Sequence, residues 1–277
     1  GSLSGGPDSG KSGEAVKVCT IASGSSGNCT LVTDGHTHIL IDAGISARRI
    51  CRSLRDLGLE PPELSGVLIT HEHTDHICGL ATLAKQIRLP VYASRGTARQ
   101  LCYRIAFLDE LVRPFRPGGR FALGELEVGT FSTPHDTAES AGYTVSDGAH
   151  KAAVVTDLGC VTEDVRNGIR GVDLLVCEAN HDEEWVRSGP YPYFLKERIL
   201  GDRGHLSNEA GAALALEAVE GGACSVVLAH LSHENNTPGR AYGTVSAVLE
   251  RSGAVPGRDV ILEVAPRSEP GRRIAVG

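Results

Sequence analysis

The sequence predicts one α/β (α+β) domain in which two β-sheets pack against each other and carry helices on their outer faces. Two observations support this prediction. Short apolar runs with strand character alternate with helix-like stretches in both halves of the 277-residue chain, with no low-complexity break or linker. Several apolar runs end directly in a histidine or an acidic residue, as expected when strand-end loops converge on one site. We expect the domain to span residues 16–277.

Composition narrows the class of protein. A net charge of −7 and a pI near 5.9 provide no overall basic surface for nucleic acid, although bound divalent cations would themselves attract phosphate. The eight cysteines are scattered without a CxxC pair, which favours reduced and mostly buried thiols in a cytoplasmic protein. Neither a membrane-spanning apolar stretch nor a secretory signal is found. We interpret residues 1–15, which are rich in Gly and Ser, as a disordered lead or a cloning remnant.

The N-terminal third predicts a series of short strands. Residues 16–21 alternate as a strand does, the polar segment 23–28 forms a tight turn, and residues 29–33 return as a second strand. Asp34-Gly35 is a strong hairpin-turn signal that leads into the apolar run 39–41.

Three histidine or acidic side chains flank these strands. We interpret His36 and His38 as surface strand residues. Asp42 ends a buried strand, where a carboxylate needs a partner, and orienting a metal-binding histidine from behind is one good reason for its presence. Ser46 is the expected N-cap of a helix that Gly58 ends.

A dense group of potential metal ligands follows the apolar run 66–69. It consists of His71, His73, Asp75 and His76. Imidazoles and a carboxylate suit Zn²⁺ or a similar divalent ion. Alternation places the first three on one side, and a turn after Asp75 frees His76 to point elsewhere, so the loop can serve two adjacent ions. The alternative is a polar loop in which histidines cluster by chance.

The rest of the chain continues this alternation of helices and strands. Helices are expected at residues 79–87, 95–107, 162–169, 182–188, 192–200, 207–220 and 238–251. A short strand is expected at 91–93, two or three antiparallel strands within 111–133, and a last strand at 260–264. Four apolar runs lead into polar strand ends that contain His135, Asp157, Glu178 to His181, and His230. This recurrence predicts that these ends meet the loop at 71–76.

Together, these residues resemble the metallo-β-lactamase superfamily. The loop at 71–76 matches its HxHxDH signature, and Asp42, His135, Asp157 and His230 fall in the order of its remaining motifs. The resemblance covers residues 16–265. It implies an αββα sandwich, with two mixed sheets packed face to face, helices on both outer faces and a dinuclear metal site at one edge.

Within the superfamily, the chain is similar to the YycJ/WalJ group of cytoplasmic proteins linked to DNA exonuclease activity. The segments that carry this similarity are 23–28, 178–182, 198–208 and 230–236. The segment 204–207 also resembles the catalytic-histidine segment of tRNase Z, whose tRNA-binding arm the chain lacks.

The resemblance implies a set of roles at the metal site. One ion would be held by His71, His73 and His135, the other by Asp75, His76 and His230, with Asp157 bridging. Zn²⁺ is the preferred ion, with Mn²⁺ or Fe²⁺ as alternatives. A hydroxide bridging the ions would be the nucleophile, and orienting this nucleophile is a second role open to Asp75 beside that of ligand. His205 would be the general acid; its alternative is a helix-capping or packing histidine.

The sequence indicates the residues that contact substrate less clearly than it indicates the metal ligands. The turn with Ser25, Ser26 and Asn28 offers backbone N–H groups and small side chains that suit phosphate. His181 fits a substrate contact, support of a metal ligand or a structural role equally well, and Asn235 fits either phosphate binding or loop structure.

Three functions follow from these patterns. The first is a metal-dependent phosphodiesterase that acts as a DNA exonuclease, and His73, where oxygen-reducing relatives carry glutamate, favours such hydrolysis. Basic residues near His205 can track a phosphate backbone, although acidic residues lie among them; they are Arg187, Lys196, Arg198 and Arg203. The second is a hydrolase of small phosphodiesters or, as in glyoxalase II, of thioesters. The third is a non-enzymatic regulatory partner with a vestigial site.

Overall fold

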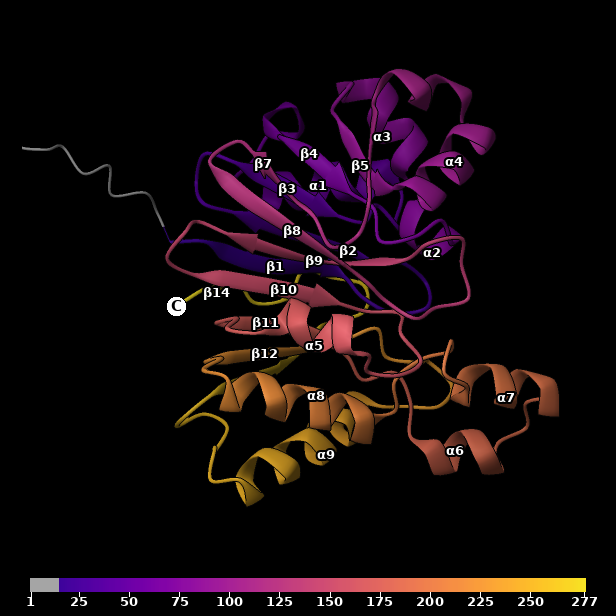
Figure 1. Cartoon of the computed structure of the whole chain (residues 1–277), viewed down its shortest axis with the longest axis vertical. Coiled ribbons are helices and arrows are strands. Elements are labelled where there is room, and N and C mark those ends of the chain that lie inside the picture. The colour runs from indigo at the N-terminus through magenta and orange to yellow at the C-terminus, as the bar shows by residue number, and fades with distance from the viewer. Residues whose placement is uncertain (1–14) are drawn as a thin grey trace, which may run out of the picture.

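Two β-sheets pack face to face in the computed structural model, which describes residues 15–277 (Figure 1). The first sheet has the strand order β14-β1-β2-β3-β4-β5-β6. Its strands are β1 (Lys17–Ala22), β2 (Cys29–Thr33), β3 (His38–Ile41), β4 (Gly66–Leu68), β5 (Val91–Ser94), β6 (Val112–Phe115) and β14 (Ile274–Ala275). Strands β3 to β6 run parallel, whereas β14, β1, β2 and β3 pair antiparallel.

The second sheet has the order β13-β12-β11-β10-β9-β8-β7. Its strands are β7 (Arg120–Leu123), β8 (Leu126–Ser132), β9 (Ala141–Ser146), β10 (Lys151–Val155), β11 (Leu174–Glu178), β12 (Ser225–Ala229) and β13 (Ile261–Val264). Strands β10 to β13 run parallel, and β7 to β10 pair antiparallel. Both sheets are therefore mixed.

Helices lie outside the two sheets. They are α1 (Ala47–Asp56), α2 (Thr74–Ile77), α3 (Leu80–Ile87), α4 (Arg95–Arg104), α5 (Glu163–Ile169), α6 (Glu183–Ser188), α7 (Tyr193–Leu200), α8 (Asn208–Glu220) and α9 (Pro238–Arg251), with 3₁₀ turns η1 (Pro61–Glu63) and η2 (Ala106–Glu110). Most of them cover the outer faces, whereas α2 belongs to the loop after β4, and α6 and α7 project to one side (Figure 1). None of the helices in residues 15–277 is long and apolar enough to cross a membrane.

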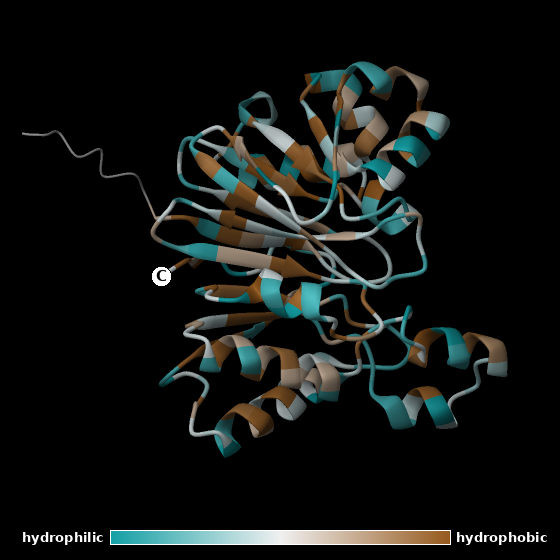
Figure 2. Cartoon of the chain, in the orientation of Figure 1, coloured by the Kyte–Doolittle hydropathy of each residue, from teal (hydrophilic) through white to brown (hydrophobic). Residues whose placement is uncertain are grey.

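The core has three layers because the central strands are buried on both faces. In β3, Ile39 and Ile41 face the second sheet, whereas Leu40 faces α1 and α3 on the outer side. In β11, Leu174 faces the first sheet and Leu175 faces the helices of the other outer layer. Hydrophobic residues accordingly dominate the strands in Figure 2.

Several expectations about the elements need correction. The strand β6, predicted as antiparallel, pairs parallel with β5 because the intervening α4 forms a crossover. His38 is buried rather than exposed, since Thr33 Oγ1 lies 2.6 Å from its Nδ1. Strands β9 and β14 were not expected. The interpretation of residues 1–15 as a lead concerns almost entirely positions outside the described residues.

The cysteines are also more exposed than expected. Of the eight thiols, Cys19, Cys29 and Cys177 are buried, while Cys78 and Cys224 are exposed; all are free. The expectation that most are buried is therefore wrong.

Candidate metal centre

Three strand ends place polar side chains at one edge of the sandwich through an unusual backbone conformation. Asp42, Asp157 and His230 follow β3, β10 and β12, and their φ angles are 63°, 59° and 58°. Asp and His enter this left-handed region more readily than most residues. The turn lets each side chain point back across the carboxyl ends of the parallel strands, where sites form in α/β sheets.

The loop from Thr70 to His76 is held in place through its main chain. Ala43 N donates to His76 O (2.8 Å), and Asn28 N donates to Asp75 O (2.8 Å). The backbone of Gly44 lies so close to the loop that a Cβ there would be 1.7 Å from Asp75 O. Because α2 begins at Thr74, Asp75 and His76 occupy its first turn, and the ring of His76 lies beside that of His71, with centroids 4.1 Å apart.

Within the described residues, four overlapping groups of potential metal ligands meet here. Two of them contain Asp157: one with His71 and His76, the other with Glu178, His205 and His230. The remaining two are separate sets of three ligand atoms. One set comes from His71, His73 and His135, the other from Asp75, His76 and His230, and within each set the atoms lie within 4.8 Å of one another. These are the two sets that the sequence analysis proposed for two ions.

Asp157 lies between the sets. Its Oδ1 is 3.5 Å from Nε2 of His135 and 3.3 Å from Nε2 of His230, and its Oδ2 is 3.1 Å from Nε2 of His76. Two nitrogen ligands of a tetrahedral ion lie about 3.3 Å apart when each bond is about 2.0 Å. The spacing therefore suits ions on both sides of this carboxylate.

Several buried polar atoms of this cluster have no hydrogen-bond partner. The Nε2 atoms of His71, His135 and His230 and Oδ2 of Asp157 are buried and have no hydrogen-bond partner. Each such atom costs about 1–3 kcal/mol if nothing compensates it. The three Nε2 atoms lie 4.0, 3.5 and 3.3 Å from Oδ1 of Asp157. Imidazole with carboxylate is a donor set for divalent metal ions, so this grouping fits bound cations.

Hydrogen bonds behind the ligands fix the direction of each ring. His76 Nδ1 donates to Asp42 Oδ2 (2.7 Å), and His135 Nδ1 donates to Gly204 O (3.0 Å). Asp42 also accepts from Thr70 N at 2.8 Å. With Nδ1 occupied, Nε2 of each ring faces the centre, which is the usual arrangement of metal-binding histidines. The expected supporting role of Asp42 thus has a geometric basis.

Glu178 joins this arrangement from β11, and the sequence analysis gave it no role. Its carboxylate is fully buried; Oε1 accepts from Nδ1 of His205 (2.7 Å) and lies 3.1 Å from Nδ1 of His230, while Oε2 accepts from Leu206 N. Although burial opposes ionisation, His205 and His230 lower the pKa of Glu178 to about 2. Like the ligands, Glu178 lies at the end of a strand, and this was the sequence feature from which a role at the site could have been inferred.

His205 lies beside the candidate ligands His135 and His230. It precedes α8, whose N-cap is Ser207, and its ring stacks on that of His230 with centroids 5.2 Å apart. Because Nδ1 is bonded to Glu178, Nε2 is free to face the cleft. The cleft has a volume of about 400 Å³ and is lined by His205, by ligands from both sets and by residues of α7.

A family model for the β-lactamase superfamily domain matches residues 37–231. The chain belongs to this superfamily. Exodeoxyribonuclease YycJ of Bacillus anthracis is 37% identical over 234 residues, covering 84% of this chain and 89% of that protein. Exodeoxyribonuclease WalJ of Streptococcus pneumoniae serotype 2 is 34% identical over 232 residues, covering 83% and 86%.

A solved structure supports the same fold. The metallo-β-lactamase fold protein YhfI from Bacillus subtilis matches with a TM-score of 0.68 at 19% identity, covering 94% of this chain and 100% of YhfI. The resemblance and the αββα fold predicted from the sequence are confirmed.

The residues predicted to contact substrate are dispersed around this superfamily site. Ser25 lines the cleft, whereas Ser26 is exposed outside it. Asn28 is directed inward: its Nδ2 donates to Gly24 O (2.8 Å), and its Oδ1 accepts from Gly24 N (3.0 Å), so it holds the turn together.

His181 and Asn235 are buried behind the cleft. His181 Nδ1 lies 3.2 Å from Asn180 Oδ1, and burial lowers the pKa of His181 to about 4. Asn235 O accepts from Asp182 N and ties the loop after β12 to α6. This placement favours the structural alternative for both, and we do not retain substrate contact for Asn28, His181 or Asn235.

Glu72 supports the ligand loop from the side opposite the ions, a role that its position between two histidines conceals in the sequence. Its Oε1 accepts from Ala138 N (3.0 Å), just beyond His135, and Arg104 Nη1 of α4 donates to Glu72 O (2.8 Å). The loop is therefore fastened to the strand end that carries the third histidine.

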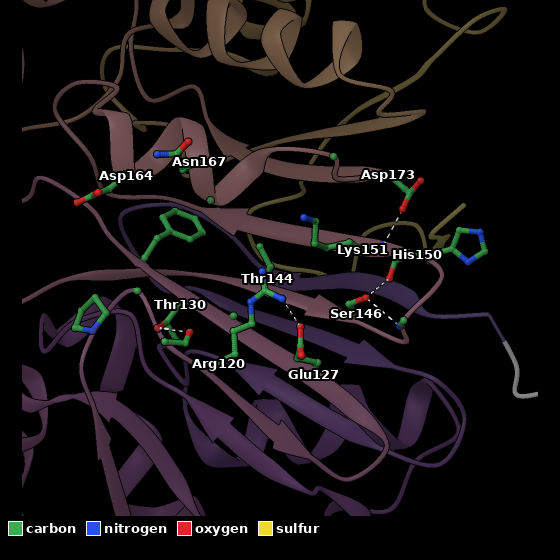
Figure 3. Close-up of a pocket in the computed structure, with 18 of the residues that line it drawn as sticks. Arg120, Glu127, Thr130, Thr144, Ser146, His150, Lys151, Asp164, Asn167 and Asp173 are labelled. Carbon is green, nitrogen blue, oxygen red and sulfur yellow. Dashed lines mark hydrogen bonds and ion pairs between the residues drawn. The ribbon is translucent and has the colours of Figure 1, made fainter.

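A larger hollow of about 560 Å³ lies on the outer face of the second sheet (Figure 3). Its charged side chains already have partners: Arg120 Nη1 is 3.3 Å from Glu127 Oε1, and Lys151 Nζ donates to Arg170 O (2.6 Å). Among the described residues, no group able to hold a metal ion lies there. We therefore place the chemistry in the cleft at the strand ends.

Proposed function

We propose that the chain is a metal-dependent phosphodiesterase that acts on DNA as an exonuclease. The observation that carries this proposal is the His205–Glu178 pair, which opens on the same cleft as the ligand cluster. The curated relatives YycJ and WalJ, named exodeoxyribonucleases, support the substrate class.

A proton donor beside the centre favours phosphodiesters over thioesters. The oxygen that leaves a phosphodiester becomes an alcohol and needs a proton, because alkoxides are strongly basic. A thiolate leaves more readily, since thiols ionise near pKa ~8.5. A histidine held by a buried carboxylate on the side of the cleft away from the ligand loop therefore fits P–O cleavage.

The proposed ligands are those that the sequence indicated. His71, His73 and His135 would hold one ion, Asp75, His76 and His230 the other, and Asp157 both. Zn²⁺ is preferred, with Mn²⁺ or Fe²⁺ as alternatives. When bound, two such ions supply charge stabilisation at the phosphoryl group and a water that ionises near neutral pH.

The protein's own groups orient the substrate and move a proton. Glu178 keeps the proton of His205 on Nδ1 in the neutral ring, so protonation of the ring adds a proton at Nε2, which faces the cleft. That proton can pass to the leaving oxygen. Arg203 and Arg198 line the same cleft and offer cationic contacts to phosphates that flank the bond being cleaved.

End-labelled single- and double-stranded DNA tests the proposal. The protein, stripped with EDTA and reloaded with each ion in turn, is expected to release nucleotides progressively from an end, and His71→Ala is expected to release none. If the reloaded protein leaves both DNA forms intact, the nuclease proposal fails. Hydrolysis of a thioester in preference to bis-p-nitrophenyl phosphate would instead support the small-substrate alternative.

A further inference from the structure

We infer that α7 is a platform for single-stranded DNA on which Phe194 stacks against a nucleobase beside the cleft. The inference rests on the proposed function and specifies the form of its substrate. Figure 1 shows α6 and α7 projecting from the layered body on the side where α2 carries two of the ligands.

The helix α7 is unusually exposed. None of its residues is buried, and Tyr193 and Phe194 are 74% and 72% exposed. The two side chains are adjacent, and an exposed aromatic ring beside a nucleic-acid site offers a face on which a base can stack. Tyr193 Oη already donates to Glu197, one turn away, whereas no hydrogen bond or ring contact engages Phe194 among the described residues.

The base of the projection is firmly attached, so the platform is rigid. Val186 of α6 is fully buried, and the guanidinium of Arg240 lies 4.3 Å from the ring centre of Trp185 and 2.6 Å from Asp182. Lys196 Nζ of α7 donates to Arg187 O of α6 at 2.7 Å.

The C-terminal end of α7 contacts the segment that carries His205. His205 N donates to Ile199 O (3.1 Å), and a Cβ on Gly204 would be 2.2 Å from the same oxygen. Movement of α7 would therefore move His205.

Phe194 is next to the side of α7 that lines the cleft. Leu195, Arg198 and Ile199 line the cleft. Phe194 lies one turn before Arg198 and is its neighbour on the helix surface. The Arg198 guanidinium is paired only with Asp136 at 3.3 Å, and both side chains are 60% exposed, so a phosphate can displace this weak pair.

The mixed charge of this region favours stacking over a purely electrostatic duplex site. Acidic residues alternate with the basic ones; they are Glu183, Glu184, Glu197 and Asp202. An aromatic ring offers a base about 1–3 kcal/mol of stacking regardless of sequence, but only an unpaired base can present its face. The occupant is therefore a single strand, with its backbone led by Arg198 toward the ligand cluster.

Binding of fluorescein-labelled oligothymidylate to metal-loaded protein in a His205→Ala background tests this. Phe194→Ala is expected to weaken binding roughly 5- to 150-fold, Phe194→Leu similarly, and Phe194→Trp to preserve it. The matched control is Tyr103→Ala, which removes an aromatic that is 88% exposed on α4 and should change nothing. With His205 present, Phe194→Ala should raise KM for the oligonucleotide but leave hydrolysis of bis-p-nitrophenyl phosphate unchanged.

Unchanged affinity in Phe194→Ala, or retention of affinity by Phe194→Leu, overturns the platform; the latter result identifies a merely apolar contact such as a protein partner's. If the unsubstituted protein cleaves DNA but Phe194→Ala has the same KM, the platform fails and the nuclease function stands. If the unsubstituted protein neither binds nor cleaves DNA, both fail.

Discussion

Oε1 of Glu178 lies 2.7 Å from Nδ1 of His205 and 3.1 Å from Nδ1 of His230, so it links the proposed proton donor to a proposed metal ligand. One buried carboxylate thereby orients two rings with different proposed roles. Its other oxygen accepts from backbone N–H groups, so it has little freedom to move.

Glu178→Gln tests this link. The amide accepts at one end only, so either the two rings, which share Oε1, or the two backbone N–H groups, which share Oε2, lose their acceptor. We expect DNA hydrolysis and metal affinity to fall by about 10- to 100-fold, as is typical when the group behind a ligand is changed. Turnover at saturating metal, together with metal content, measures the two effects separately. Wild-type values for both would show that Glu178 only fills space.

His205→Ala should affect substrates according to their leaving groups. Loss of a general acid costs on the order of 10²- to 10⁴-fold on DNA. The loss on bis-p-nitrophenyl phosphate should be far smaller, because nitrophenolate leaves without a proton. His233→Ala is the matched control, since His233 also lines the cleft but is bonded only to Glu234 at the surface. Equal losses on both substrates would argue against proton donation.

Metal removal should lower the thermal stability as well as the activity. The buried Nε2 atoms of His71, His135 and His230 have no hydrogen-bond partner, so an ion that binds the folded state stabilises it. EDTA is expected to lower Tm by several degrees, and Zn²⁺ to restore it. His71→Ala should show a smaller response to EDTA. An identical Tm with and without EDTA would contradict a structural contribution from the ions.

Gly44→Ala should disrupt the ligand loop although it replaces none of the proposed ligand residues. The new Cβ would be 1.7 Å from Asp75 O and 2.6 Å from Asn28 N, so the loop must move. We expect a loss of at least about 1–3 kcal/mol in the free energy of unfolding and reduced metal content. Gly239→Ala is the control, because open space surrounds that position in α9. Urea unfolding and metal analysis provide the two measurements.

His38 should make folding sensitive to acid. Burial lowers the pKa of His38, so below pH ~6.5 the unfolded chain binds a proton there that the folded chain does not. Stability is thus expected to fall as the pH falls from 7.5 to 5.5 and to fall less in His38→Asn. The difference between the two proteins isolates this residue from the other histidines. Parallel pH profiles would show that His38 titrates equally in both states.

The local sequence pattern was sufficient to predict much of the fold and the residue types of the ligands. The strand ends at His135, Asp157 and His230 could be predicted because an apolar run ending in a polar residue is a feature of neighbouring positions. The five helices after residue 160 begin within one residue of their expected starts, where N-cap residues such as Thr162, Asp182 and Ser207 mark them.

Other features could not be predicted from the sequence because they depend on contacts between distant segments. His38 looks like a surface residue beside its turn, and only pairing with its neighbouring strands buries it. β14 is a two-residue strand, too short for any periodic signal, and forms because β1 offers a free edge. Asn28, His181 and Asn235 have polar side chains of the right kind for substrate, but all three are buried, and the side chains of Asn28 and His181 make hydrogen bonds within the protein.

The sequence by itself determined the chemistry of the ligands, their order and the strands that carry them, because these are properties of residue type and local spacing. Only the tertiary structure decided that Glu178 joins His205 to His230 and that α7 stands beside the cleft. The family resemblance had already implied that Asp157 bridges the two ligand sets, and its distances to His135 and His230 are compatible with that position. The physical reason is that these relationships arise when the two sheets pack and bring strand ends far apart in the chain to one edge.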